Sequence, residues 1–554
     1  MTGLVPLPVI LPLLGAGVTL VLARRPRAQR ITSVTALTAT FGVALALLVT
    51  AHMDGPQVVR VGGWPVPLGI VLVADQLATL MLVVSTAVTL CVLLYSIGEG
   101  RADGRESTPV AIYHPTYLIL TAGVTNAFLS GDLFNLYVGF EVLLGASYVL
   151  LTLGGTEVRI RAGTTYVVVS ILSSVIFLTA IGLVYAATGT VNLAQLAGRL
   201  DALPDDLRLV LQLMLLLAFG IKAAVFPLSA WLPDSYPTAP APVTAVFAGL
   251  LTKVGVYAII RTETLLFPGG RTGDLLLVVA LLTMVVGILG AVAQSDIKRL
   301  LSFTLVSHIG YMLFGIALGS VAGLASAIFY VVHHITIQTT LFLATGLVER
   351  RGGSTNLERL GGLARAPSLA VLFFLPALNL AGIPPFSGFL GKLGLLQAGV
   401  ADGTPLAWLV VAGGALTSLL TLYAMTRVWN LAFWRQPAPS IAVGGAEPAK
   451  PLGLSGTGRL WGTGRLSGVP SARGASPGVP PADSASIPSA AGGPVAVEPM
   501  PPLLVGATAA LVVLGLTLTL LAGPIFGVSS ESAANLVERT PYVEAVLRPV
   551  AGAR

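Results

Sequence analysis

Long runs of apolar residues recur along the whole chain and limit what it can fold into. Each run is about twenty residues long, the length of helix that crosses the hydrocarbon core of a bilayer. The chain has 554 residues, of which 55% are hydrophobic and only 10% are charged. Soluble proteins carry about 25% charged residues. The pattern therefore predicts an all-α polytopic membrane protein.

The apolar runs divide into about fourteen candidate transmembrane segments. In chain order they are 3–23, 31–52, 72–97, 112–130, 132–153, 162–187, 207–236, 241–262, 274–294, 300–319, 322–348, 368–398, 405–434 and 501–525. The seventh and twelfth segments contain prolines, so we expect broken helices there.

Basic residues predict the orientation of these segments. They gather after the odd-numbered segments, at Arg24, Arg25, Arg27, Arg30, Arg101, Arg105, Arg159, Arg161, Lys298, Arg299, Arg350, Arg351, Arg359 and Arg365. Cytoplasmic loops carry the excess of lysine and arginine. We therefore expect a multi-pass protein of the cell membrane with both termini outside.

Residues 436–500 differ from the rest of the chain. They are rich in Gly, Pro, Ser and Ala and have no apolar period. Such a composition predicts a flexible linker, on the cytoplasmic side, that leads to the last segment. Its role is either that of a spacer or that of a docking or regulatory segment.

Lysine and arginine are used differently in this chain. Only five of the 31 basic residues are lysine, yet Lys222, Lys253 and Lys392 lie inside predicted segments, while arginines gather near segment ends. Arginine keeps its proton in proteins, whereas a desolvated lysine can release it. The three lysines are therefore candidates for sites that load and release protons.

Other ionisable residues also fall inside predicted segments. They are Glu141, His308, His333 and His334, while Asp75 stands near the start of the third segment and is expected to be interfacial. Intramembrane ionisable groups usually mark ion or proton paths. Each can also be a satisfied structural group, as when a neutral histidine bonds a neighbour or a lysine reaches the interface. We expect the acid, lysines and histidines together to form a proton relay of coupled titrations.

Two similar stretches suggest an internal repeat. "FPLSAWLPD" (226–234) and "PPFSGFLGK" (384–392) align on Pro227 and Pro385, the latter preceded by Pro384. They lie in the seventh and twelfth segments, and an offset of five reverses the direction of crossing. We therefore expect two inverted five-helix repeats, segments 4–8 and 9–13. Broken helices at matching places in such repeats point to a transport site.

Three long motifs resemble a known family. "FNLYVGFEVLLGASYVLLTLGG", "FGIKAAVFPLSAWLPDSYPTAPAPVTAVFAGLLTKVGVYAIIR" and "NLAGIPPFSGFLGK" are similar to the antiporter-like membrane subunits shared by respiratory complex I and Mrp-type multisubunit Na+/H+ antiporters. The similarity covers about residues 70–435, and the motifs are most similar to the D-type subunits of Mrp antiporters. The resemblance implies a secondary ion transporter component rather than an enzyme.

The resemblance also implies roles for residues and a division of the chain. Glu141, Lys222, Lys253 and Lys392 match the family's relay positions, with His308, His333 and His334 along the connecting path. One position departs, because Gln338 stands where many relatives have a lysine, so the central path must use the histidines, water or another course. The expected domains are 1–111, 112–263 and 264–435, then the linker 436–500, then 501–554 with the last helix and tail.

Partners follow from the same evidence. We expect other membrane subunits, protons and Na+, and the lipid bilayer. Nucleic acid is not expected, since basic residues beside membrane segments explain the net charge of +7. No cofactor or metal is expected, because the chain has no P-loop or dinucleotide motif, and its single cysteine, Cys91, cannot build a cysteine-ligated site.

Two other functions fit the sequence. The chain can be a proton-pumping component of a redox enzyme, either complex I or a membrane-bound hydrogenase, whose redox chemistry lies on other subunits. It can also be a scaffold that holds partner subunits in the membrane. Small hydrophobic antiporter subunits encoded nearby favour the antiporter; quinone or hydrogenase subunits favour the redox enzyme.

Overall fold

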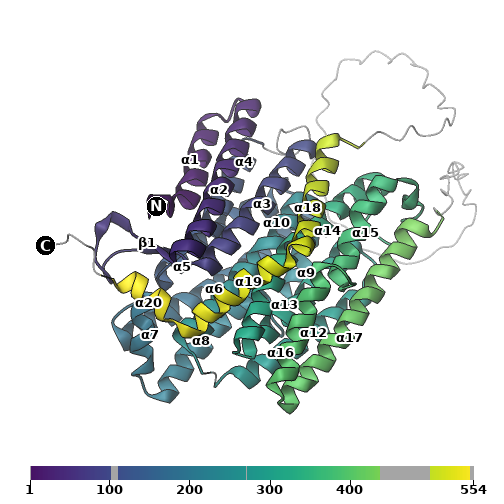
Figure 1. Cartoon of the computed structure of the whole chain (residues 1–554). Coiled ribbons are helices and arrows are strands. Elements are labelled where there is room, and N and C mark those ends of the chain that lie inside the picture. Colours follow the sequence, from purple (N-terminus) through teal and green to yellow (C-terminus); the bar gives the residue numbers. More distant parts are fainter. Residues whose placement is uncertain (1, 101–109, 270, 437–499, 549–554) are drawn as a thin grey trace, which may run out of the picture. The chain divides into compact units, whose positions relative to one another are not determined.

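A computed structural model describes residues 2–100, 110–269, 271–436 and 500–548 (Figure 1). Arg101, Arg105 and the predicted linker, apart from its two end residues, lie outside the described residues. In the described part, ten helical stretches are long and apolar enough to cross a membrane, judged by length and composition. The prediction of a polytopic helical membrane protein is therefore confirmed.

The helices follow one another along the chain as shown in Figure 1. They are α1 (Leu7–Val21), α2 (Pro26–Asp54), α3 (Gln76–Glu99), α4 (Tyr113–Leu129), α5 (Leu133–Thr152), α6 (Glu157–Thr188), α7 (Leu193–Asp201), α8 (Asp205–Ala223), α9 (Trp231–Ser235), α10 (Ala241–Val246), η6 (Phe247–Leu251), α11 (Thr252–Arg261), η7 (Thr262–Leu266), α12 (Gly273–Val292), α13 (Ile297–Ala317), α14 (Val321–Gly352), α15 (Pro367–Ala381), α16 (Ser387–Asp402), α17 (Pro405–Val428), η9 (Trp429–Trp434), α18 (Pro502–Leu520), α19 (Ala522–Glu538) and α20 (Thr540–Leu547). Each predicted apolar segment overlaps one helix or consecutive helices.

Some elements differ from the sequence prediction. The apolar pattern places the start of the third segment at residue 72, but Val71–Ala74 forms strand β2, which pairs antiparallel with β1 (Gln57–Arg60), so α3 begins only at Gln76. The pattern extends the last segment to 525, but α18 ends at Leu520 and α19 follows in another direction. In Figure 1, α19 runs across the helices towards α20 and α7. Apolar length alone cannot separate such a turn from a continuous span.

Helix α14 forms the centre of the bundle. It packs against α3, α10, α13, α15, α16, α18 and α19. The most apolar stretch of α14 is entirely buried. A helix that is buried on every side has no apolar stripe along one face. Its functional polar residues can therefore be recognised only from their residue types and not from the periodicity of the sequence.

Two helices of the bundle are interrupted. Helix α8 ends where Ala224 turns the chain with φ of 59°, and α15 ends where Gly382 turns it with φ of 83°. Pro227 and the pair Pro384–Pro385 follow, and helices resume at Trp231 and Ser387. At the first interruption α11 comes very close, because a Cβ on its Gly255 would lie 2.7 Å from the Ala223 nitrogen. Only glycine allows this approach.

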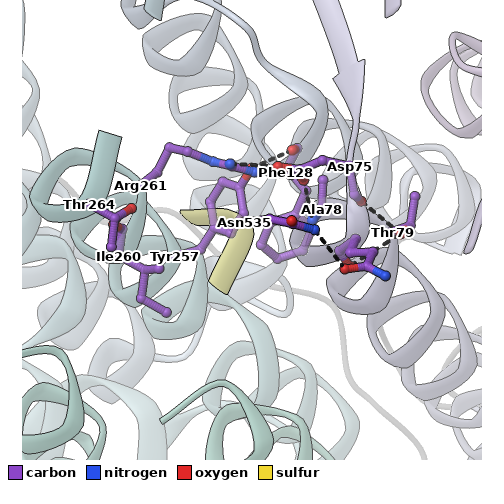
Figure 2. Close-up of polar contacts among 10 residues, drawn as sticks. Asp75, Ala78, Thr79, Phe128, Tyr257, Ile260, Arg261, Thr264 and Asn535 are labelled. Carbon is purple, nitrogen blue, oxygen red and sulfur yellow. Dashed lines mark hydrogen bonds and ion pairs between the residues drawn. The ribbon is translucent and has the colours of Figure 1, made fainter. Parts of the chain in front are cut away.

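A buried ion pair joins α3 to α11 (Figure 2). Asp75 caps α3 by accepting from the Ala78 nitrogen, and its two oxygens accept from the Arg261 guanidinium at 2.6 and 2.8 Å. Arg261 also donates to the Tyr257 hydroxyl at 3.1 Å. The pair explains how an arginine can lie buried near the end of an apolar segment, since its charge is compensated.

Removing one partner of this pair should destabilise the fold. Asp75→Asn leaves the Arg261 charge buried without its counter-ion, which costs about 3 kcal/mol or more. Asp234→Asn is the control, because Asp234 pairs with Arg299 on the surface, with side chains 65% and 47% exposed, and should cost less than about 1 kcal/mol. Thermal melting of the purified complex measures both. Equal losses of melting temperature would contradict the assignment.

Candidate functional site

Glu141 of α5 and Lys222 of α8 are joined through a serine. The Ser174 hydroxyl of α6 donates to the Glu141 carboxylate, and the Lys222 ammonium donates to the Ser174 oxygen at 3.2 Å. Lys222 is only 8% exposed. A carboxylate, a hydroxyl and an ammonium thus form one hydrogen-bonded chain across three helices, in which a proton can move by exchange.

The interruption after α8 shapes the surroundings of Lys222. The indole of Trp231 donates to the Ile221 carbonyl at 3.2 Å across the break. The Lys222 nitrogen lies 4.9 Å from the centre of the Phe140 ring, close enough for a cation–π interaction. A cavity of about 20 Å³ is lined by Lys222, Trp231, Ser173 and other residues. That space fits about one water molecule.

Lys253 lies on α11 directly after a π-helical segment. Its ammonium is fully buried and donates to the carbonyl of Ala248, within that segment, at 2.6 Å. A π-bulge shifts the backbone hydrogen bonds and is frequent at functional sites. Among the described residues, Lys253 forms no hydrogen bond with another member of the predicted relay.

Lys392 of α16 is held by the end of the interrupted helix α15. Its ammonium donates to the carbonyls of Leu380 and Ala381, both at 3.0 Å, and to the Ser418 hydroxyl at 3.2 Å. The nitrogen also lies 5.3 Å from the centre of the Tyr311 ring. Carbonyls at a helix C-terminus carry partial negative charge, so they suit an ammonium group.

The three histidines form one buried cluster with Tyr330. The Tyr330 hydroxyl lies 2.9 Å from Nδ1 of His308, and the rings of His308 and His334 are 5.2 Å apart. Nδ1 of His333 contacts the Ser387 hydroxyl at 3.0 Å. The cluster therefore connects α13 and α14 to the start of α16, the helix that carries Lys392.

Several polar atoms on α14 have no partner among the described residues. They are Nε2 of His333, both ring nitrogens of His334 and Oε1 of Gln338. The amide of Gln338 donates to the Leu301 carbonyl at 2.7 Å. Buried polar groups are normally satisfied, by protein or by ordered water. These atoms can accept or donate to water, which is a requirement of a proton path.

The structure thus gathers the predicted residues into two clusters and one separate lysine. The first is Glu141 with Lys222, the second is the histidine group beside Lys392, and Lys253 forms no hydrogen bond with either group among the described residues. Sequence reasoning missed most of the residues that contact the members of each cluster. Ser174, Ser418 and Tyr330 are neutral and common in helices, so no signal in one sequence marks them, whereas Ser387 lies within the repeated stretch 384–392.

Residues 130–421 match the family model for "NADH:quinone oxidoreductase/Mrp antiporter, TM". The D-type component of the Na(+)/H(+) antiporter of Alkalihalophilus pseudofirmus is 40% identical over 78% of this chain and 87% of the relative.

Two solved structures share the fold. A chain of the Mrp complex from Dietzia sp. is 35% identical, with a TM-score of 0.84, over 99% of this chain and 100% of that chain. A chain of respiratory complex I from Thermus thermophilus is 23% identical, with a TM-score of 0.73, over 96% and 99% of the two chains, and it shows similarity of fold alone. The chain belongs to the family of antiporter-like membrane subunits shared by NADH:quinone oxidoreductase and Mrp antiporters, and within it to the D-type subunits of Mrp antiporters.

Proposed function

We propose that this chain is the proton-translocating component of a multisubunit Na+/H+ antiporter of the cell membrane. The observation that carries the proposal is the hydrogen-bonded chain Glu141–Ser174–Lys222 inside an apolar bundle. An acid and a lysine are costly to place inside a membrane bundle, and such groups usually mark ion or proton paths. The family of the chain and the name of its relative from Alkalihalophilus pseudofirmus support the same function.

The serine gives the first cluster a defined proton transfer. Ser174 donates its hydroxyl proton to Glu141 and accepts from Lys222. When a proton leaves the Lys222 nitrogen for the Ser174 oxygen, the serine passes its own proton to the Glu141 carboxylate. The products are a neutral amine and a neutral carboxylic acid. The ammonium–carboxylate state and the amine–carboxylic acid state therefore hold the same number of protons and have the same net charge.

The rest of the proposed relay consists of two further lysines, the histidines and water. In our proposal, Lys253 exchanges protons with the first cluster through water, and the histidines carry them to Lys392. His333 and His334 offer the unpartnered nitrogens that such water needs. Gln338 cannot carry a proton, so the histidines take its place. We assign Lys392 as the terminal group, as the resemblance to the family implies, and its ammonium is held by neutral oxygens.

Backbone pairings support two repeats, helices 4–8 and 9–13 of the fourteen predicted segments. Asp132 caps α5 and forms an isolated bridge with Asn192, while Asp296 caps α13 and forms one with Asn356. In both pairs the asparagine follows the aspartate by 60 residues. The five-segment offset alone pairs Glu141 with His308 by position, but the caps align Glu141 with Leu305, and His308 lies one helical turn further on.

The lining of one cavity supports the inversion of these repeats. A cavity of about 600 Å³ contains Asp296 and Thr355 together with Val158 and Arg159. The last two lie at the start of α6, the end of the bundle away from Asp132. The two capping aspartates therefore stand at opposite ends, as an inverted repeat requires.

The same cavity supports the proposed orientation. Lys298, Arg299 and Arg350 also line it, so basic residues from three predicted cytoplasmic loops meet at one end. We propose that this end faces the cytoplasm and that both termini lie outside.

The proposed domains remain 1–111, 112–263, 264–435 and 501–554, and the linker 436–500 joins the last two of them. The partners are the other membrane subunits of the antiporter.

Truncation of the first cluster should stop transport. Glu141→Ala and Lys222→Ala in the assembled antiporter should each reduce the Na+-driven pH change in everted vesicles by about a hundredfold, since a positioned proton-transfer group contributes about that much. Glu157→Ala is the control, because Glu157 is exposed at the start of α6. A scaffold would keep transport in both variants, which would contradict the relay.

Loss of the serine hydroxyl should weaken transport without removing a charge. Ser174→Ala deletes hydrogen bonds to two charged groups, each worth about 1.5–3 kcal/mol, and should slow exchange by about tenfold or more. Thr179→Ala, which removes an exposed hydroxyl from the same helix, should change the rate by less than about twofold. Equal rates for both variants in everted vesicles would show that Glu141 and Lys222 exchange protons without Ser174.

A further inference from the structure

Glu263 is a carboxylate that does not belong to the proposed relay. It lies in η7, directly after α11, and is partly buried. The Gln212 amide donates to its two oxygens at 3.1 and 2.9 Å, and the Thr272 hydroxyl donates to one of them at 2.9 Å. A buried carboxylate normally has a cation beside it. Among the described residues, Glu263 has neutral donors only.

The cations around Glu263 are engaged elsewhere. Arg208 and Arg539 pair with Asp201, Arg271 with Asp206, and Arg261 with Asp75. Arg208 lies on α8, Arg539 directly after α19, Arg271 in the turn before α12, and Arg261 on α11. Helix α7 also packs against η7, and its Arg199 donates to the Thr188 carbonyl. Asp205 at the start of α8 and Asp274 at the start of α12 add negative charge. None of these arginines forms an ion pair with Glu263 among the described residues, and a proton is the smallest positive partner that can neutralise the carboxylate.

Glu263 has access to space for water. A cavity of about 130 Å³ is lined by Glu263, Thr272 and Gly269. A second cavity of about 270 Å³ is lined by Gln212, Arg208 and Gly269. The hydrogen-bonded group of Glu263, Gln212 and Thr272 stands between them. Each cavity holds several water molecules by volume.

The same two helices lead from Glu263 to the relay. Gln212 and Lys222 are ten residues apart on α8, and Lys253 and Glu263 are ten residues apart along α11 and η7. Ten helical residues rise about 15 Å. Glu263 therefore lies about 15 Å beyond the two lysines along these helices, on the side away from the basic cavity that Pro237–Ala241 help to line.

We propose that Glu263 is a proton-binding carboxylate at a port where protons enter or leave the relay from the side opposite the basic cavity. The inference rests on the proposed antiport function. It adds a site at the end of the bundle, beyond the row of Glu141, lysines and histidines. Water in the two cavities would exchange protons with the carboxylate, and further water would connect it with Lys222 and Lys253.

The first test reads the protonation of Glu263 directly. Infrared difference spectra of the purified multisubunit complex, recorded across a series of pH steps, show the C=O band of each carboxyl group that takes up a proton. Glu263→Gln keeps the acceptor oxygen for Gln212 and Thr272 but should lose one such band. Glu358→Gln changes an exposed glutamate, whose band should differ in position and width from that of a buried group. Spectra of Glu263→Gln identical to those of the parent would overturn the proposal.

The second test separates the port from the relay. Glu263→Gln should slow Na+-driven proton movement in everted vesicles by about tenfold or more, whereas Glu263→Asp should retain part of it and Glu358→Gln all of it. If Glu263→Gln transports at the parent rate while Lys222→Ala does not transport, the port is wrong and the relay stands. If Lys222→Ala transports at the parent rate, the proposed function fails, whatever the infrared spectra show.

Discussion

Three ammonium groups lie inside an apolar bundle, and the rest of the site depends on the oxygen atoms that hold them. Lys392 donates hydrogen bonds to two carbonyls at the end of α15, Lys253 donates to one carbonyl in a π-helical segment, and Lys222 donates to the Ser174 hydroxyl. A charge without such partners is very costly in a low-dielectric interior. The carbonyls that hold Lys392 and Lys253 belong to a helix end and to a π-helical segment, where the regular hydrogen-bond pattern is interrupted. Irregular backbone therefore accompanies two of the three buried lysines, and a side-chain hydroxyl holds the third.

This constraint also distinguishes the ends of the proposed relay. Lys222 is one hydroxyl away from a carboxylate, so its proton can move while the net charge of the pair stays constant. Lys392 has only neutral oxygens around it, so release of its proton changes the local charge by one unit. A moving cation nearby would affect Lys392 more strongly than Lys222, because the electrostatic change there is uncompensated. Because of this difference, the two ends of the proposed relay are not equivalent, and Na+ can be coupled to proton movement at Lys392 more strongly than at Lys222.

The sequence predicts the framework of this protein well, for clear physical reasons. Apolar length identifies the helices, proline identifies the interruptions near Pro227 and Pro385, and the rarity of lysine singles out Lys222, Lys253 and Lys392. Other features could not be predicted. Ser174 is an ordinary helical serine, and Asp75 and Arg261 are separated by 186 positions, so only the fold brings the pair together. The turn between α18 and α19 also escapes detection, because both sides of it are apolar.

The central claim is that Lys222 acts by releasing a proton, and one substitution tests it directly. Lys222→Arg keeps a positive charge and hydrogen-bond donors for Ser174, but arginine does not give up its proton. The measurement is Na+-driven pH change in everted vesicles that contain the fully assembled complex. The account predicts that the variant assembles as the parent does and transports at the level of Lys222→Ala. Transport at the parent rate would show that Lys222 serves only as a fixed charge.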